Sequence, residues 1–307
     1  GWMRRGFDAN ESRTELGSIG NRKQSGRIVL RVRSETGAPA QLLRQGCYDS
    51  FRDTVWLAAR NQFASVPSET DGTSWEFQAR TRTDNSFTLF TSMPGPEGIL
   101  PLPPDAARVE NLPAGGLETN MLGAVRVKEP PGFVGCGVHH GAERSFDLPP
   151  DRTVDLQVPN KERPGLEQIV RELRLETMTD PEKIATLRSY FEGNFAYRLF
   201  VPENLHHPTD SDTPLARFLF RSRKGHCEYF ATATVLLLRA AGVPARYATG
   251  YSVQESPDHG SSFVIRERHA HAWTLVWQNG RWENLDTTPA ARIGIENERA
   301  SAWQWLA

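Results

Sequence analysis

Gly225-His226-Cys227-Glu228-Tyr229-Phe230-Ala231 opens an apolar run that reaches Ala241, and the rest of the predicted fold follows from this run. Apolar side chains recur in this run every three or four residues, which is the spacing of one face of a helix. Gly242, with Pro244 two residues further on, is a helix stop signal. The sequence therefore predicts a buried helix whose first turn contains Cys227.

A cysteine in the first turn of a helix is well placed for chemistry. The free N–H groups of that turn and the cationic loop 221–224 before it stabilise a thiolate, so we expect a lowered pKa for Cys227. A buried cysteine that serves only as a small apolar side chain is the simpler interpretation. That interpretation holds unless a base, and a residue that orients the base, follow further along the chain.

A histidine and a carboxylate do follow, on the two arms of one predicted β-hairpin. Asn279-Gly280 is the turn signal, and a two-residue loop there makes Gln278 face Arg281. Because side chains alternate between the two faces of a sheet, His271 and Asp286 then lie on the same face as diagonal neighbours. A histidine oriented by a carboxylate and supplied to a helix-start thiol is the general form of an activated nucleophile.

These motifs resemble the transglutaminase-like superfamily of papain-type thiol enzymes over roughly residues 165 to 290. Besides the stretch quoted first, the resemblance is carried by Leu238-Arg239-Ala240-Ala241-Gly242-Val243-Pro244-Ala245-Arg246, Thr249-Gly250-Tyr251, His271-Ala272-Trp273 and Leu285-Asp286-Thr287-Thr288-Pro289. By position, the resemblance implies that Cys227 is the nucleophile, His271 the base and Asp286 the orienting carboxylate.

Two positions depart from the pattern of bacterial members of this superfamily. Leu275 stands where an acidic residue is often found, two places after the His-Ala-Trp motif. Thr287 stands where many members have a proline after the aspartate. Neither departure removes a member of the predicted triad, but both bear on the region expected to form the substrate groove.

The resemblance implies acyl transfer on protein or peptide amides through a thioester at Cys227. Resolution of the thioester by an amine gives transglutamination, and resolution by water gives deamidation or proteolysis, with the same triad in each case. No cofactor is implied, and the sequence contains no recognisable calcium loop. The alternative from another functional class is a non-catalytic cell-envelope binding or scaffold module in which the triad is occluded.

His269 is a second histidine close to the predicted base. In one continuous strand over 263–277 it shares a face with His271, and together with Asp286 and Cys227 these residues offer acceptable types of zinc ligand. Structural zinc usually takes ligands in closely spaced pairs, so we expect no metal site here. His269 is then expected behind the catalytic groups, on the substrate side of the site or at its rim.

The composition excludes several classes of function. The 307 residues carry 36 Lys and Arg against 37 Asp and Glu, which gives no support for nucleic acid or an anionic membrane as the partner. The longest apolar stretch contains Arg239 and is too short to span a bilayer. The expected partner is a protein or peptide substrate.

Cys47 and Cys136 either pair in an oxidising compartment or remain free buried thiols.

The pattern along the chain predicts an α+β fold in three parts. Residues 1–26 are polar and aperiodic, and we expect a linker-like segment. Short strand-like runs between Gly and Pro residues predict a β-rich domain over 27–160. These runs are 28–33, 41–48, 54–57, 75–81, 87–90, 124–128 and 154–158. Residues 161–307 form the predicted catalytic domain, in which helices come before antiparallel strands.

Two helices and a loop are predicted between the boundary and the catalytic helix. One helix covers 166–175, and a second begins after Thr179, where Asp180-Pro181 follows a capping residue. The segment 202–214, which contains His206 and His207, is expected to be a polar loop.

The stretch 44–56 also resembles the β-rich module that precedes the catalytic domain in one branch of the superfamily. Members of that branch are bacterial inner-membrane proteins whose extracytoplasmic part is flanked by membrane helices. The resemblance implies that this chain is such a part, on the periplasmic or extracytoplasmic side, anchored through segments absent from this chain. A free-standing cytoplasmic protein is the alternative.

Overall fold

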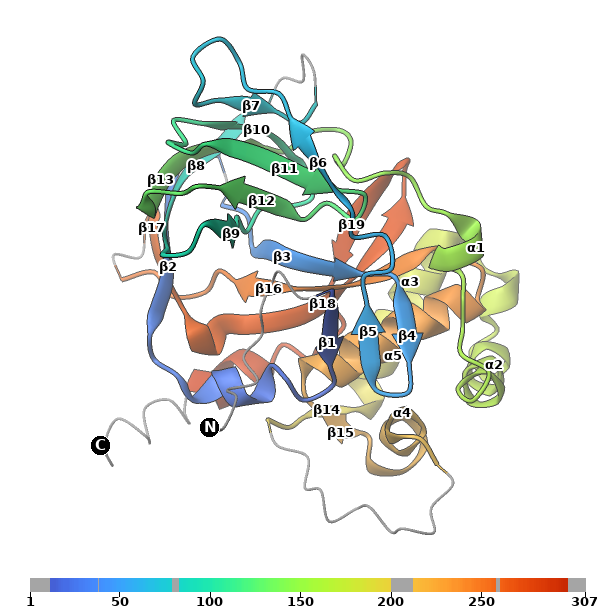
Figure 1. Cartoon of the computed structure of the whole chain (residues 1–307). Coiled ribbons are helices and arrows are strands. Elements are labelled where there is room, and N and C mark those ends of the chain that lie inside the picture. Colours follow the sequence, from blue (N-terminus) through green and yellow to red (C-terminus); the bar gives the residue numbers. More distant parts are fainter. Residues whose placement is uncertain (1–11, 38, 79–82, 200–211, 258–259, 298–307) are drawn as a thin grey trace, which may run out of the picture.

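The structure, a computed structural model, describes residues 12–37, 39–78, 83–199, 212–257 and 260–297 (Figure 1). The α+β fold class predicted from the sequence is confirmed, with β-sheets followed along the chain by helices and then by further strands. The helices and helical turns are η1 (Gly20–Gln24), α1 (Arg152–Asp155), α2 (Arg163–Glu172), η2 (Leu175–Thr177), α3 (Asp180–Asn194), α4 (Pro214–Arg217), η4 (Phe218–Ser222), α5 (Cys227–Ala240) and η5 (Glu267–His269). Residues 292–297 are also helical.

The strands are short and fall mainly in the first half of the chain. They are β1 (Arg13–Glu15), β2 (Ile28–Thr36), β3 (Leu42–Tyr48), β4 (Ser50–Arg52), β5 (Val55–Leu57), β6 (Phe63–Val66), β7 (Trp75–Glu76), β8 (Asn85–Met93), β9 (Glu97–Ile99), β10 (Ala106–Glu110), β11 (Gly116–Asn120), β12 (Val125–Lys128), β13 (Gly132–His140), β14 (Ala196–Tyr197), β15 (Lys224–Gly225), β16 (Ala245–Ser252), β17 (Ser262–Arg266), β18 (Ala270–Gln278) and β19 (Arg281–Leu285).

Two sheets make up most of the β-rich half, which lies in the upper part of Figure 1. One sheet has the strand order β17-β2-β8-β13-β10-β7, and the other has the order β6-β11-β12-β9. Along β8 and β13 the burial alternates with a period of two, so each strand places one set of side chains in the core. The predicted β-rich character of this region is thereby confirmed.

The second half of the chain is built on the sheet β19-β18-β16-β3, against which α5 packs. The start of α5 at Cys227 and the left-handed conformation of Gly242 after its end confirm the predicted helix bounds. The predicted hairpin is also confirmed, because Gln278 pairs with Arg281 across the turn. The capping box of Thr179 and Glu182 begins α3 as expected.

Strands cross the boundary predicted near residue 160 in both directions. β3, from the first half of the chain, pairs with β16 in the catalytic sheet. β17, from the second half, pairs with β2 in the sheet of the β-rich half. The two halves therefore share their backbone hydrogen bonds, and a division of the chain at this boundary stays a prediction.

Two predicted strands differ in the structure. The run 263–277 is not one strand, because the turn η5 separates β17 from β18 and sends them to different sheets. The run 154–158 is not a strand either, because Asp151 accepts a hydrogen bond from the Thr153 N–H and starts the short helix α1. In both cases a local capping interaction overrides the β-branched and apolar composition.

The N-terminal segment is not the linker predicted over 1–26, as far as residues 12–26 describe it. β1 pairs with β5, and η1 packs on η5, next to it in Figure 1. Ile19 and Lys23 are both buried. Polar composition was a poor guide here, because the polar side chains of this segment find partners inside the protein.

Buried ion pairs join the two halves. Arg246 is fully buried, stacks on Trp282 and forms a salt bridge with Asp155 at 3.0 Å. Asp155 also forms a salt bridge with Arg60 at 2.9 Å.

All three cysteines lie within the described residues and are free, so Cys47 and Cys136 form no disulfide. No helix among the described residues is long and apolar enough to cross a membrane.

Candidate active site

Cys227 begins α5 and lies entirely inside the protein. His226 is the N-cap residue of the helix, and the thiol of Cys227 is 0% exposed. The backbone N–H of Ala272, in β18, donates a hydrogen bond to the Cys227 sulfur. The catalytic helix and the histidine strand therefore meet at the sulfur atom.

His271 lies in β18, one residue before this contact, and its ring is oriented by Asp286. Nε2 of His271 lies 2.7 Å from Oδ2 of Asp286. A carboxylate acceptor favours the tautomer with its proton on Nε2, which leaves Nδ1 with a lone pair. Nδ1 is buried and has no hydrogen-bond partner among the described residues. It is the ring nitrogen available to a thiol proton.

The backbone around His271 is packed too closely for larger residues. In the register of β16 and β18, Gly250 lies opposite His271. A Cβ atom on Gly250 would stand 2.0 Å from the carbonyl oxygen of Leu43 in β3. Only glycine allows β3 to approach this closely, so the β-rich half helps to fix the position of the histidine strand.

Asp286 follows β19 and is itself held by several donors. The N–H of Thr288 donates to Oδ1 at 3.0 Å, and Arg292 lies 3.4 Å from Oδ2. The hydroxyl of Thr287 is 2.6 Å from that of Thr234 in α5, which fastens this loop to the catalytic helix. Thr287, one of the departures from the family pattern, thus has a structural contact of its own.

The protonation equilibria of the site run opposite to the expectation for the thiol. Burial raises the pKa of Cys227 to about 12, although Lys23 acts in the other direction. Burial also lowers the pKa of His271, against the attraction of Asp286. Burial by itself would raise the pKa of Asp286, but His271 holds it below its usual range. The covered site therefore favours a neutral thiol and a neutral imidazole, because water reaches neither group.

Glu228, the residue after the nucleophile, anchors the N-terminal segment to the site. Its carboxylate accepts hydrogen bonds from the backbone N–H groups of Gly17 and Ile19 at 3.1 and 3.3 Å, and from the Ser18 hydroxyl at 3.2 Å. Burial raises the pKa of Glu228 to about 7 in spite of these donors. The sequence offered only its place at a helix start, and the partners lie about 210 positions away.

His269 does not share a strand face with His271, which corrects the expectation that raised the question of zinc. It belongs to η5, where its Nδ1 accepts the backbone N–H of Arg266 at 3.1 Å. Burial lowers its pKa to about 4. Its hydrogen bond gives it a structural role at the turn that separates β17 from β18.

Three further residues of the site were not found from the sequence. Nζ of Lys23 lies 2.8 Å from Oε1 of Glu296, and the hydroxyl of Tyr197 donates to the same oxygen at 2.5 Å. All three side chains are buried. Lys23 and Glu296 are 273 positions apart and carry no local motif, so their pairing cannot be predicted from the sequence around either residue.

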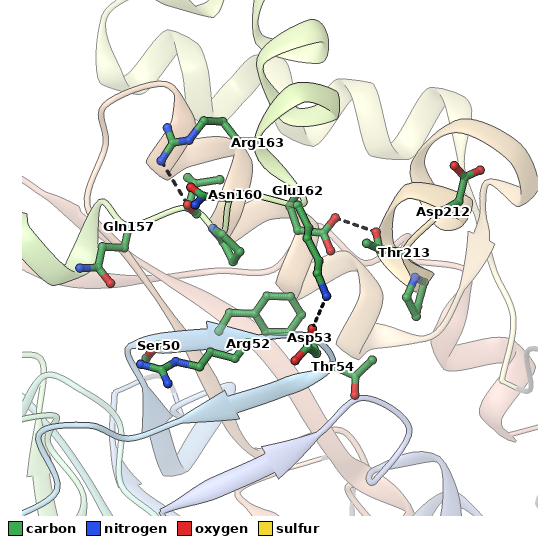
Figure 2. Close-up of a pocket in the computed structure, with 15 residues that line it drawn as sticks. Ser50, Arg52, Asp53, Thr54, Gln157, Asn160, Glu162, Arg163, Asp212 and Thr213 are labelled. Atoms are coloured by element: carbon green, nitrogen blue, oxygen red, sulfur yellow. Dashed lines mark hydrogen bonds and ion pairs between the residues drawn. The ribbon is translucent and has the colours of Figure 1, made fainter. Parts of the chain in front are cut away.

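Among the described residues, one surface hollow lies away from the buried centre and another reaches Asp286. One, of about 820 Å³, is lined by residues of the β4–β5 turn, the start of α2 and the start of α4. Figure 2 shows the Thr213 hydroxyl donating a hydrogen bond to Glu162 on one side of this hollow. Lys161 donates a hydrogen bond to Asp53 at 3.0 Å. The second, of about 590 Å³, is bordered by Asp286 and the end of α3. The expected loop histidines His206 and His207 lie outside the described residues.

One family model and several known proteins match parts of this chain. Residues 167–287 match the family model described as the transglutaminase-like superfamily. The chain is 34% identical over 173 residues to a protein-glutamine gamma-glutamyltransferase of Pseudomonas aeruginosa, which covers 54% of this chain and 25% of that protein. It is 27% identical over 147 residues to the human kyphoscoliosis peptidase, which covers 47% of this chain and 21% of that protein.

A solved structure resembles nearly the whole chain. The periplasmic domain of TgpA from Pseudomonas aeruginosa, bound to ethylmercury, aligns with a TM-score of 0.71 at 25% identity, covering 94% of this chain and 99% of that one. The β-rich half and the catalytic half are therefore both present in that domain. The chain spans only about a quarter or less of the length of the curated relatives named above.

Proposed function

Because residues 167–287 form a domain of the transglutaminase-like superfamily, we propose that this chain is a thiol acyl-transfer enzyme acting on protein or peptide amides. Cys227 is the nucleophile, His271 the general base and acid, and Asp286 the residue that orients His271. The observation that carries the proposal is the 2.7 Å contact between His271 and Asp286, which leaves Nδ1 of His271 without a partner among the described residues, one residue before the Ala272 N–H that donates to Cys227.

The first half of the reaction forms a thioester. The proton of the Cys227 thiol passes to Nδ1 of His271, and the thiolate attacks the carbonyl carbon of the amide. N–H groups in the first turn of α5, including that of Cys227, stabilise the oxyanion. The imidazolium returns the proton to the nitrogen as the C–N bond breaks, and ammonia or an amine leaves.

The second half resolves the thioester. An amine or a water molecule attacks the carbonyl carbon, gives a proton to the neutral His271, and the C–S bond breaks to release the thiolate. Attack by an amine on a glutamine thioester yields an isopeptide bond. Attack by water yields a carboxylic acid, which is deamidation for a glutamine side chain and proteolysis for a backbone amide.

The buried state of the triad favours a second candidate function. Cys227 and His271 are both 0% exposed, which is the arrangement expected of a non-catalytic cell-envelope binding or scaffold module with an occluded triad. In the enzyme, the residues that bury Cys227 have to move before an amide can reach its sulfur atom. The two candidates differ in whether Cys227 forms and releases a thioester with a substrate.

Amine incorporation is the test of the proposed function. A biotinylated pentylamine and a glutamine-rich test protein are incubated with the wild type and with Cys227→Ala, beside a peptide-cleavage assay on the same samples. Label, released ammonia or new peptide ends that depend on Cys227 support the enzyme. Equal background from both proteins, with iodoacetamide failing to label native Cys227, supports the scaffold module instead.

The proposed place of action is the periplasmic or extracytoplasmic side of a bacterial inner membrane. Support comes from the similarity to the periplasmic domain of TgpA and from the short share of the relatives' length that this chain spans. In this proposal the full protein is anchored through segments outside the chain. A cytoplasmic protein is the alternative, and fractionation of cells that express the full-length protein separates the two.

A further inference from the structure

An alkylammonium group of the protein itself lies inside the candidate site. The Nζ atom of Lys23 contacts Glu296, and the two side chains are only 2% and 7% exposed. The charge of Lys23 acts on titratable groups at the start of α5, in η5 and in β18, namely His226, Cys227, Glu228, His269 and His271. Two of these groups, Cys227 and His271, take part in the proposed reaction.

Both members of the ion pair are carried by segments attached to catalytic residues. The segment that leads into η1 is held by Glu228, next to the nucleophile. Glu296 belongs to the helical residues 292–297, and Arg292, one turn earlier, contacts Asp286 at 3.4 Å. The position of the ammonium is thus set by the same residues that build the triad.

The carboxylate of Glu296 is built to hold a cation. Oε1 accepts hydrogen bonds from both Lys23 and Tyr197, while Oε2 is buried without a hydrogen-bond partner among the described residues. A buried ion pair adds little to stability, because the loss of hydration offsets the attraction, whereas a buried carboxylate without a cation is strongly unfavourable. One ammonium can replace another without leaving Glu296 unpaired, so exchange is far easier than removal.

We propose that Glu296 and Tyr197 form a subsite for the primary ammonium group of an acyl acceptor, and that Lys23 occupies this subsite until an acceptor displaces it. The proposal rests on the proposed acyl-transfer function and adds how the amine is recognised. The ligand class is an unbranched alkylamine such as a lysine side chain, since Lys23 is one. Glu296 takes one proton from the bound ammonium, and the resulting amine attacks the thioester. Its second proton goes to His271, and the C–S bond breaks.

Binding of pentylamine measures the subsite without any turnover. In the Cys227→Ala background, calorimetric titration is expected to give a Kd at least tenfold lower when Lys23→Met removes the internal competitor. Glu296→Gln is expected to abolish binding in either protein. Lys183→Met is the matched control, because Lys183 lies on α3 and also pairs with a carboxylate, that of Asp180, at 3.0 Å. The Kd for pentylamine should be the same with and without this substitution.

The double variant Lys23→Met/Glu296→Gln guards against misfolding. It leaves no unpaired charge and is expected to melt cooperatively, so absence of pentylamine binding there reports the lost carboxylate and not an unfolded chain. If Lys23→Met leaves the Kd for pentylamine unchanged, or if Glu296→Gln binds pentylamine as the parent does, Lys23 and Glu296 form only a structural ion pair and the subsite does not exist.

Kinetics with two acceptors separate this proposal from the proposed function. Biotin pentylamine is charged at neutral pH, whereas a biotin hydrazide of equal length is neutral. Glu296→Gln is expected to raise the KM of the amine at least tenfold and to change that of the hydrazide much less; equal changes would overturn the subsite. A wild type that gives no label, no ammonia and no new peptide ends contradicts the enzymatic function alone, and the titration still decides the subsite.

Discussion

Nε2 of His271 faces Oδ2 of Asp286 at 2.7 Å, fifteen positions apart in sequence, and this contact selects which ring nitrogen is free. The carboxylate accepts a hydrogen bond from Nε2–H, so the neutral ring keeps its basic lone pair on Nδ1. The hydrogen bond therefore fixes the tautomer as well as the orientation of the base. That dependence can be tested without removing the base itself.

Asp286→Asn should reverse the tautomer of His271. An amide NH₂ directed at Nε2 would move the ring proton to Nδ1, where it blocks acceptance of the thiol proton. By analogy with the serine-protease triad, we expect kcat to fall by about 10³ to 10⁴-fold. Steady-state amine incorporation checks the loss, and a thermal melt checks folding. A loss below tenfold would show that the contact does not set the tautomer.

The two neighbouring histidines should differ sharply when each is replaced by alanine. His271→Ala removes the proposed base and should cost roughly three orders of magnitude or more in kcat. His269→Ala removes the acceptor of the Arg266 N–H, and should lower stability by about 1 kcal/mol with less than about a tenfold effect on kcat. Assays of both variants with and without a chelator complete the test. Equal losses with chelator sensitivity would indicate a metal site instead.

Glu228 should make the protein less stable as the pH rises through neutrality. Its folded pKa, raised to about 7 by burial, lies above the unfolded value near 4.3, so its favourable contribution is complete at low pH and lost as pH rises through about 7. Relative to Glu228→Gln, the wild type should lose up to about 3 kcal/mol of unfolding free energy between acid and mildly alkaline pH.

Urea unfolding of the wild type and Glu228→Gln at several pH values from 5.5 to 8 provides the measurement. Burial lowers the pKa values of His226 and His269 to about 4, so both are neutral in the folded protein over this range. Their unfolded-state titration is common to the two proteins and cancels in the difference. Parallel stability profiles for the two proteins would contradict the raised pKa of Glu228.

The ion pairs between the two halves should contribute to stability according to their burial. Asp155→Ala leaves the fully buried Arg246 without its 3.0 Å partner, and should lower the unfolding free energy by about 3 to 5 kcal/mol. Lys161→Ala is the control, because Lys161 and Asp53 are both 75% exposed, and its effect should stay within about 1 kcal/mol. Chemical denaturation of both variants measures the loss of unfolding free energy, which should be larger for Asp155→Ala. Similar losses for the two variants would contradict the prediction.

The features predicted correctly from the sequence are those set by near neighbours. The start of α5 at Cys227 follows from a helix pattern with a glycine stop, and the hairpin around Asn279-Gly280 follows from one turn. The hairpin pairing ends at Thr274 and Leu285, yet it carries His271 and Asp286 into contact. Short-range hydrogen bonds decide these elements, so a short window of residues contains the needed information.

The features that were missed depend on distant partners. The insertion of β3 beside β16, the pairing of β17 with β2 and the ion pair of Lys23 with Glu296 each join positions about 200 or more apart. Nothing local in the polar segment around Lys23 distinguishes it from a linker. The raised pKa of Cys227 is not predictable from its neighbours either, because it is caused by burial in the folded protein.

The pairing of β17 with β2 also sets an order of events during synthesis. The ribosome makes β2, at residues 28–36, long before β17, at residues 262–266, so the nascent sheet exposes an open edge on β2 while the intervening chain is translated. Cys227 is made before β17 and β18, and therefore before His271. The last backbone hydrogen bonds of the first sheet thus form only when the histidine strand is about to emerge, which couples completion of the scaffold to assembly of the reactive centre.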